Sequence, residues 1–375
     1  YEIGVRLVGS EMCIRDRRYP ETMKALVAYG KGDYRLERNY PVPPCGDDDI
    51  LIKTDACGIC ASDVKCLHGA ESYWGNETAE GWAKPPFIPG HEFLGHVVYV
   101  GGNVTDFKVG DRVTPEQIAP CGECRFCKRG QYWMCNPHKM YGYFNDFCGG
   151  MAEYVRLRVK HSRIHKVPED MELKSAILIE PYGCAKHCVD RAQIGSEDVV
   201  VLAGAGTLGL GMTTYAASRN PAQLIVLDMI DSRLEKAKEF GADIVMNPGK
   251  EDVVAKVLEM TGGYGCDIYI EATGAPASVR QGMQMIRKLG RFVEFSVFGQ
   301  ETSLDWSIIG DKKELDVLGA HISPYCYPYV IEHMYDGRMK TDGVVTGLYS
   351  LDDWETAFEK ASGKYGDLKV AFTFD

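Results

Sequence analysis

Three short stretches of the chain carry side chains that bind metals. The first, Cys57-Gly-Ile-Cys-Ala-Ser-Asp63, places a thiol, a hydroxyl and a carboxylate directly after an apolar run. The second, Pro89-Gly-His-Glu-Phe93, adds an imidazole and a carboxylate, and the third, Leu178-Ile-Glu-Pro181, adds another carboxylate. Such ligands from separate segments suit a zinc ion that keeps one position open for water or substrate. The stretches therefore predict a catalytic metal site.

Four cysteines form a separate cluster with the spacing C-x2-C-x2-C-x7-C. Thiols at this spacing can surround one tetrahedral zinc ion, and four thiolates leave no open position for chemistry. An iron-sulfur cluster is the alternative, but the run lacks the ferredoxin spacing with its trailing Cys-Pro. We therefore predict a structural zinc site at Cys121, Cys124, Cys127 and Cys135.

A glycine-rich turn predicts a dinucleotide site. The apolar run 198–203 leads into Gly204-Ala-Gly-Thr-Leu-Gly209, a helix-like stretch follows, and a second apolar run ends in Asp228. This arrangement indicates a Rossmann-type unit, in which a pyrophosphate lies at a helix N-terminus. The Asp228 carboxylate would bind the adenosine ribose diol and repel a 2′-phosphate, which favours NAD over NADP. The cofactor-binding candidates are Gly204, Gly206, Thr207, Leu208, Gly209, Asp228 and Arg233.

An alternative role for Asp228 is to cap the helix that follows it. Ser232, with Glu235 three residues later, already matches a capping box at the start of that helix. We therefore assign Asp228 to the cofactor.

The segments around these motifs divide the chain into two domains. Between residues 23 and 181, short apolar runs are separated by Gly, Pro and Asp, which is typical of a compact barrel-like β domain. From residue 182 to 324, six predicted strands alternate with helices, as in a doubly wound parallel sheet. Residues 368–374 alternate as an antiparallel strand does, so residues 325–375 are predicted to return to the first domain. The sequence thus predicts an α/β protein with its active site between the domains.

Composition and charge argue against several classes of function. In a chain of 375 residues, a net charge of −11 without clustered Lys and Arg argues against nucleic acid and anionic membranes as partners. No apolar run has the length of a membrane span, and no signal peptide is found, so we expect a cytoplasmic protein. Residues 1–22 fit neither domain and are predicted to be a non-native or disordered extension.

In their order along residues 23–375, the motifs resemble those of the zinc-containing medium-chain dehydrogenase/reductase family. They are residues 58–63, residues 90–92, the four-Cys lobe at 119–137 and residues 204–209. Ile179-Glu-Pro181, with Glu where ethanol-type members have a third Cys, resembles the polyol dehydrogenase branch. The resemblance implies a GroES-like catalytic domain, a Rossmann NAD-binding domain, two zinc ions per chain, and a homodimer or homotetramer.

The resemblance also implies a ligand set for the catalytic zinc. Cys60 and His91 match zinc ligands, and Glu92 and Glu180 compete for the third position, directly or through water. Asp63 matches an acid that orients the ligand His.

The proton path is implied only in part. Ser62 matches the hydroxyl that relays the proton of the alcohol. Many relatives have a His that passes this proton to solvent, but this chain has Lys65, and an ammonium has no lone pair to accept a proton. The catalytic candidates are therefore Ser62, Glu180 and Lys65, with the later part of the relay unassigned.

The implied reaction is reversible hydride transfer from a secondary alcohol of a small polyol to NAD, giving a ketose. Erythritol and L-threitol are favoured, because residues 65–70, 123–135, 293–299 and 321–328 resemble those of the polyol dehydrogenases that act on them. Sorbitol dehydrogenases present an Arg to a substrate hydroxyl, and here Ile322 takes its place beside His321, which disfavours sorbitol. Xylitol, sorbitol, galactitol and threonine stay open as alternatives, as does a noncatalytic dinucleotide-binding relative.

Overall fold

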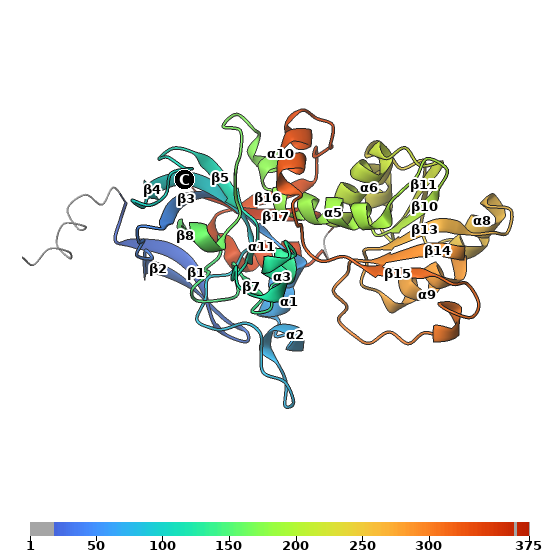
Figure 1. Ribbon diagram of the computed structural model, residues 1–375, viewed down its shortest axis with the longest axis horizontal. Helices are drawn as coiled ribbons and strands as arrows, with labels where there is room; N and C mark the ends of the chain where they lie inside the picture. Colours follow the sequence, from blue (N-terminus) through green and yellow to red (C-terminus); the bar gives the residue numbers. More distant parts are fainter. Residues whose placement is uncertain (1–18, 364–365, 375) are drawn as a thin grey trace, which may run out of the picture.

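The first domain is organised around β3 (Asp49–Ile59), whose Ile50, Leu51 and Ile52 are fully buried. The computed structural model describes residues 19–363 and 366–374, and this domain occupies the left half of Figure 1. Its main sheet has the order β16-β17-β3-β4-β5-β9, and β8 also pairs with β3. The other strands of this sheet are β4 (Glu92–Val100), β5 (Arg112–Pro115), β8 (Tyr154–Arg158), β9 (Ile164–Lys166), β16 (Val345–Tyr349) and β17 (Lys369–Thr373).

Shorter elements complete this domain. Two small antiparallel pairs, β1 with β2 and β6 with β7, lie beside the main sheet. These strands and the helices of the domain are β1 (Thr22–Gly30), β2 (Asp33–Pro41), β6 (Ile118–Ala119), β7 (Lys139–Met140), α1 (Ala61–Leu67), α2 (Glu71–Trp74), α3 (Arg125–Lys128), α4 (Leu173–Ala176) and α11 (Trp354–Ala361).

The folded part of the chain includes residues that the sequence analysis assigned to an extension. The strand β1 begins at Thr22, and the carbonyl of Glu21 accepts a hydrogen bond from the amide of Val42 (2.9 Å). The rings of Tyr19 and Tyr99 meet edge to face with centroids 6.0 Å apart. The fold therefore extends to residue 19 at least, and the rest of the predicted extension, residues 1–18, lies outside the described residues.

A late segment of the chain completes the first sheet. The strand β17 pairs antiparallel with β3, with Val370 opposite Ile59, and parallel with β16. Residues far apart in sequence are thereby joined in one sheet. The register also brings Lys369, at the start of β17, to the end of β3, where the first metal-binding stretch lies.

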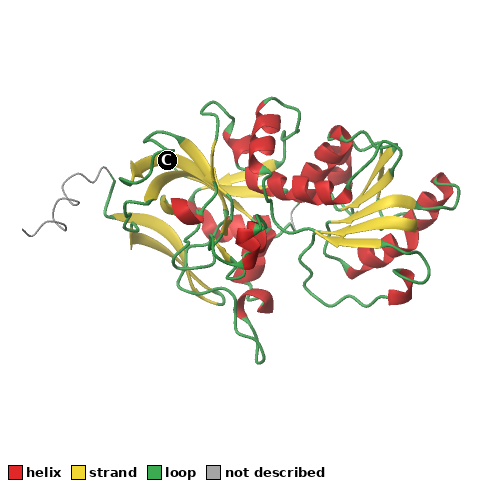
Figure 2. Cartoon of the chain, in the orientation of Figure 1, coloured by secondary structure: helices red, strands yellow, loops and turns green. Residues whose placement is uncertain are grey.

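The second domain contains a parallel sheet with the order β12-β11-β10-β13-β14-β15, on the right of Figures 1 and 2. The six strands predicted from the alternating pattern are all present. The strands are β10 (Val199–Ala203), β11 (Gln223–Leu227), β12 (Ile244–Met246), β13 (Cys266–Glu271), β14 (Ile286–Glu294) and β15 (Asp316–Gly319). The helices between them are α6 (Thr207–Ser218), α7 (Asp231–Glu239), α8 (Val253–Met260) and α9 (Pro276–Met285). The predicted capping box at Ser232 is wrong, because the N-cap of α7 is Ile230.

Two helices lie between the domains, α5 (Ile179–Ala192) and α10 (Tyr327–Tyr335), near the centre of Figure 1. The helix α5 packs on α6, α10, β4 and β14. One buried apolar cluster includes Leu94 of β4, Tyr182 of α5, Val330 of α10 and Val200 of β10. Because this core crosses the boundary, burial of apolar surface holds the two domains together.

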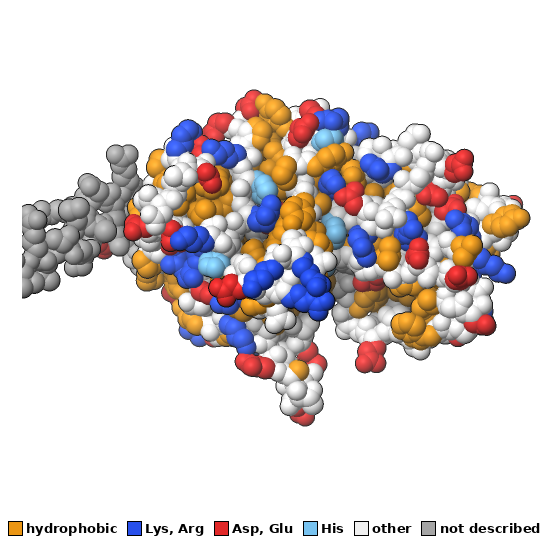
Figure 3. Space-filling model, viewed as in Figure 1, with side chains coloured by type: hydrophobic (Ala, Val, Ile, Leu, Met, Phe, Trp, Pro, Cys, Tyr) orange, Lys and Arg blue, Asp and Glu red, His pale blue; other side chains and the backbone are white. Residues whose placement is uncertain are grey.

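The predicted fold class, a barrel-like β domain with a doubly wound parallel-sheet domain, is confirmed. On the face shown in Figure 3, Lys and Arg side chains lie among Asp and Glu over both domains. Within residues 19–363 and 366–374, every helix is too short or too polar to cross a bilayer.

Candidate active site

The candidate metal centre lies where β3 ends and β4 begins. Cys60 directly follows β3 and forms the N-cap of α1, so the first stretch is a strand-to-helix junction rather than only a loop. Glu92 opens β4 opposite Gly58, and His91 precedes it. Gly90 has φ of +92°, a conformation that residues with a Cβ rarely adopt, and it turns His91 towards Cys60. The ligand atoms of Cys60, His91 and Glu92 all lie within 4.8 Å of one another.

Asp63 supports this centre from the first turn of α1. Its Oδ2 accepts a hydrogen bond from the amide of Cys60 (2.9 Å), and its Oδ1 lies 3.7 Å from Nδ1 of His91. Asp63 is fully buried, and Oδ1 has no hydrogen-bond partner among the described residues. Burial by itself lowers the pKa of His91, but Asp63, Cys60 and Glu180 together outweigh it, and the pKa is raised well above its ordinary value. A thiol, an imidazole and buried carboxylates thus form a donor set that fits a divalent cation.

Glu92 is held by a buried ion pair with Lys369. The Nζ atom of Lys369 donates to Oε2 of Glu92 (2.5 Å) and to the carbonyl of Ile59 (3.2 Å). Both side chains are almost completely buried. The Glu92 carboxylate raises the pKa of Lys369 against the opposing effect of burial, so this cation is a fixed part of the site.

Glu180, in the first turn of α5, lies outside the group of three ligand atoms. Its Oε1 accepts hydrogen bonds from Nε2 of Gln117 and from Sγ of Cys184 (3.3 Å). Burial, with the nearby charge of Glu92, raises the pKa of Glu180 to about 7. The two predicted competitors therefore lie in different places. Glu92 lies beside Cys60 and His91, whereas Glu180 is hydrogen-bonded to Gln117 and Cys184.

Ser62 and Lys65 have different partners, although both lie on α1. The hydroxyl of Tyr143 donates to Oγ of Ser62 (2.9 Å) and lies 3.5 Å from Nδ1 of His91. Lys65 instead donates from Nζ to the carbonyl of Val297 (2.6 Å), which follows β14 in the second domain. Lys65 thus joins the two domains and is not bonded to Ser62.

The four clustered cysteines form a second candidate metal site around α3. Their sulfur atoms lie within 4.8 Å of one another, and those of Cys121 and Cys127 are 4.0 Å apart. Zn–S bonds of about 2.3 Å in a tetrahedron require roughly 3.8 Å between sulfurs. Backbone amides donate to Sγ of Cys121 from residues 123 and 124, and such bonds from Asn136 and Cys127 lower the pKa of Cys124 to about 6. Backbone bonds thus lower the pKa of Cys121 and Cys124, whereas burial raises the pKa of Cys127 to about 12 and also raises that of Cys135. The positions of the four sulfurs fit one tetrahedral zinc ion.

The glycine turn opens onto the N-terminus of α6, as expected for a pyrophosphate site. Gly204 has φ of +105°, and a Cβ on Gly206 would enter open space. Oδ2 of Asp228 accepts from the amide of Ala205 (2.7 Å) and Oδ1 from that of Ile230 (2.9 Å), so Asp228 also holds the turn in place. Arg233 donates from Nη2 to the carbonyl of Asp367 (3.3 Å), and its buried Nε has no hydrogen-bond partner among the described residues. These residues fit a dinucleotide.

Sequence reasoning missed three residues of the candidate active site. Gln117, Tyr143 and Lys369 belong to no motif, and each reaches the site from a distant segment. Only Lys369 could have been noticed in the sequence. It directly precedes the apolar run Val370-Ala-Phe372, and a Lys that is buried with such a strand is rare unless it is paired with a carboxylate.

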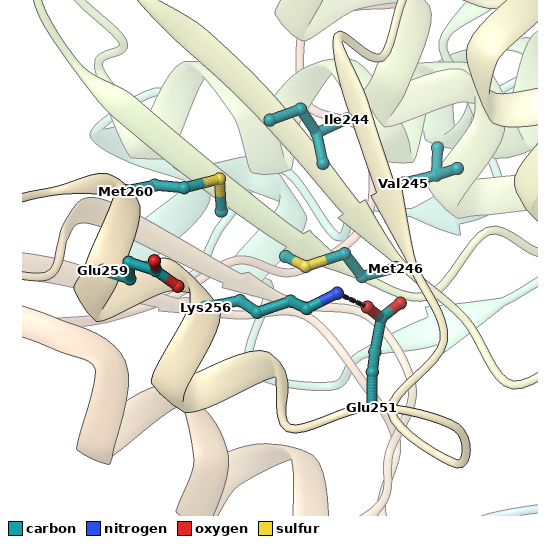
Figure 4. A pocket seen from close by; sticks show the side chains of 7 residues that line it. All are labelled: Ile244, Val245, Met246, Glu251, Lys256, Glu259 and Met260. Carbon is teal, nitrogen blue, oxygen red and sulfur yellow. Dashed lines mark hydrogen bonds and ion pairs between the residues drawn. The ribbon is translucent and has the colours of Figure 1, made fainter.

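A hollow in the second domain lacks comparable chemistry. It lies beside β12 and α8, and Figure 4 shows the ion pair of Lys256 and Glu251 across it. The other lining residues are Ile244, Val245, Met246, Glu259 and Met260. None of the lining residues is a Cys or His, so we assign no site there.

A metal-binding β domain joined to a dinucleotide-binding domain defines a class of protein, the metal-dependent dehydrogenases. A family model described as alcohol dehydrogenase GroES-like domain matches residues 46–169, and one described as zinc-binding dehydrogenase matches residues 207–335. The chain therefore belongs to the zinc-containing medium-chain dehydrogenase/reductase family, in its polyol dehydrogenase branch. It is a zinc-dependent alcohol or polyol dehydrogenase that uses a nicotinamide dinucleotide.

Individual relatives cover nearly the whole chain. The chain is 46% identical to erythritol/L-threitol dehydrogenase of Mycolicibacterium smegmatis over 94% of this chain and 98% of that protein. It is 36% identical to L-threonine 3-dehydrogenase of Pyrococcus abyssi over 93% and 97% of the two chains. A structure of a Sinorhizobium meliloti protein bound to NADP matches with a TM-score of 0.85 and 28% identity, covering 95% of this chain and all of that one.

Proposed function

We propose that this protein oxidises a secondary alcohol of a four-carbon polyol, erythritol or L-threitol, to a ketose with NAD, reversibly. The observation that carries the proposal is the convergence of Cys60, His91 and Glu92 beside the Ser62 hydroxyl, in a relative of a dehydrogenase named for those two polyols. When bound, zinc lowers the pKa of an alcohol that it coordinates, and the nicotinamide accepts the hydride.

The residues of the chain divide the remaining work. Cys60, His91 and Glu92 would hold the catalytic zinc. Their ligand atoms all lie within 4.8 Å of one another and Glu180 is not in this group, which favours Glu92 over Glu180 as the third ligand. We assign to the Ser62 hydroxyl the step of taking the proton of the alcohol. Lys65 would help to hold the two domains together through Val297, because its ammonium is bonded across the domain boundary.

NAD is the proposed cofactor, although a solved neighbour binds NADP. The support is the carboxylate of Asp228 at the end of β11, where a 2′-phosphate would meet a negative charge. The bonds from Ala205 and Ile230 fix this carboxylate in the glycine turn, so it cannot swing aside.

The substrate and cofactor are tested by NADH or NADPH formation with erythritol, L-threitol, D-threitol, xylitol, sorbitol, galactitol and L-threonine. We expect kcat/KM to be highest with erythritol or L-threitol and NAD. Preference for sorbitol or threonine would keep the chemistry and overturn the substrate. Absence of turnover with every alcohol, in protein that carries two zinc ions per chain, would favour a noncatalytic dinucleotide-binding protein.

We also propose a homodimer formed through the second domain, as the building block of the expected dimer or tetramer. The support is an open sheet edge, because within the described part of the chain β15 pairs with β14 alone. Apolar side chains near this edge are exposed, with exposed fractions of 76% for Trp306, 54% for Val297 and 45% for Val317. An unpaired strand edge with exposed apolar side chains favours association with the same edge of a second copy of the chain.

Replacing Trp306 and Val317 with Lys should convert the dimer to a monomer, which light scattering coupled to gel filtration would show. Tyr264→Lys is the matched control, because Tyr264 is equally exposed (81%) but lies between α8 and β13. An unchanged mass in the double variant would exclude this edge as the interface.

A further inference from the structure

The hydroxyl of Ser62 has a partner that no motif in the sequence indicates. Tyr143 follows β7, and its hydroxyl donates to Oγ of Ser62 over 2.9 Å. The same hydroxyl lies 3.5 Å from Nδ1 of His91. Tyr143 is 2% exposed, so this contact is shielded from bulk water.

The position of the Tyr143 ring is fixed by aromatic neighbours. It stacks on Tyr73 with centroids 5.5 Å apart, on His91 at 5.7 Å, and lies against Trp82 at 4.8 Å. Contacts on several sides leave the ring little freedom to rotate away. The hydroxyl is therefore held towards Ser62 before any substrate binds.

The side chain expected to continue the proton path is directed elsewhere. Lys65 lies one turn after Ser62 on α1, and its ammonium donates to the carbonyl of Val297 in the second domain (2.6 Å). Tyr73 also interacts with Ser62, and Tyr143 is the side chain that donates a hydrogen bond to Oγ of Ser62.

We propose that Tyr143 is the positioning residue of Ser62 in the oxidation of the alcohol. By donating to one lone pair of Oγ, Tyr143 leaves the second lone pair and the Ser62 proton directed away from the aromatic cluster. The O–H bond of the alcohol then breaks as a new O–H bond forms on Ser62, and the original Ser62 proton passes to water in the cleft. Tyr143 keeps its own proton throughout. The inference rests on the proposed function, because it concerns the same alcohol proton.

The test is a double-mutant cycle with Tyr143→Phe, Ser62→Ala and both together, in full-length zinc-loaded protein. Tyr143→Phe keeps the ring and removes only the hydroxyl. We expect kcat to fall about 10- to 100-fold, which is less than the roughly 10²- to 10⁴-fold contribution of a proton-transferring group itself, with KM changed less than about twofold. The solvent deuterium isotope effect on kcat should increase, because proton transfer becomes slower. In the Ser62→Ala background, removal of the Tyr143 hydroxyl should cost nothing further, because the two residues act as one unit.

Two further readouts separate positioning from a structural role. Zinc content and melting temperature of the Tyr143→Phe protein should match those of the wild type. Tyr141→Phe is the matched control, because Tyr141 is also fully buried and its hydroxyl bonds to Ser162 instead (2.5 Å). It should leave kcat and the isotope effect unchanged.

The outcomes distinguish this inference from the proposed function. A wild-type protein that oxidises polyols, with Tyr143→Phe equal to it in kcat and isotope effect, would overturn the inference alone. Additive losses in the cycle, or loss of zinc with the hydroxyl, would also overturn it. A wild-type protein inactive on every alcohol would overturn both.

Discussion

Replacement of Cys60 with serine is expected to reduce kcat/KM for the polyol by at least about 10³-fold. A metal that lowers the pKa of an alcohol from roughly 16 to about 7 offsets about 12 kcal/mol of the cost of deprotonation. Loss of a few kcal/mol of this effect already corresponds to a thousandfold in rate. Serine keeps the size of the side chain but is a poorer zinc ligand than a thiolate. The zinc content measured by atomic absorption should fall from two ions per chain to one.

Cys148→Ser is the control for this substitution, because Cys148 bonds to a backbone carbonyl and belongs to neither group of candidate metal ligands. It should change neither zinc content nor rate. His91→Asn should reproduce the effect of Cys60→Ser, since it removes a second ligand of the same group. Full activity and two zinc ions in both variants would contradict the placement of the catalytic metal.

Replacement of Lys369 with methionine is expected to destabilise the protein by about 3–5 kcal/mol, the usual cost of leaving a buried charge without its partner. In the native structure Lys369 and Glu92 are 4% and 2% exposed, so water cannot replace the lost ammonium. Methionine has nearly the same length and fills the space, which isolates the loss of charge. The measurement is urea unfolding after removal of the catalytic zinc, because Glu92 is a proposed ligand of that ion and a bound cation would replace the lost ammonium.

A second substitution and a surface pair make this test specific. In the same protein without catalytic zinc, adding Glu92→Gln to Lys369→Met should recover part of the lost stability, because a neutral amide then replaces the unpartnered carboxylate. Lys24→Met removes the cation of an exposed pair with Asp352 and should leave the unfolding midpoint nearly unchanged. Equal effects of the buried and exposed substitutions would show that Lys369 contributes no more than a surface ion pair.

The dinucleotide domain could be predicted from the sequence because its signals are local. Each strand is a continuous apolar run, and the glycine turn, α6 and Asp228 follow one another within about thirty residues. The cap of α7 was nevertheless wrong, because Asp228 binds the amide of Ile230 and the helix begins before Ser232. A local pattern predicts the element better than its first residue.

The candidate active site could be predicted only where its residues carry motifs. Cys60, His91 and Glu92 were found because each follows a glycine-containing turn beside a predicted strand. Their register could not be predicted, because the pairing of Gly58 with Glu92 depends on how β3 and β4 align. The roles of Tyr143 and Lys369 could not be predicted either, because each reaches the site from a segment far away in the sequence. Only the folded first domain brings these segments together.

The position of β17 also has a consequence for synthesis on the ribosome. The chain is synthesised from its N-terminus, so β3, β4 and the four-Cys lobe are made before the second domain. The strand β17 is made after it. Until then Glu92 lacks its ammonium partner and β3 has one edge without β17. The sheet of the first domain therefore stays incomplete while the whole second domain is translated. The sheet of the second domain can form before β17 is made.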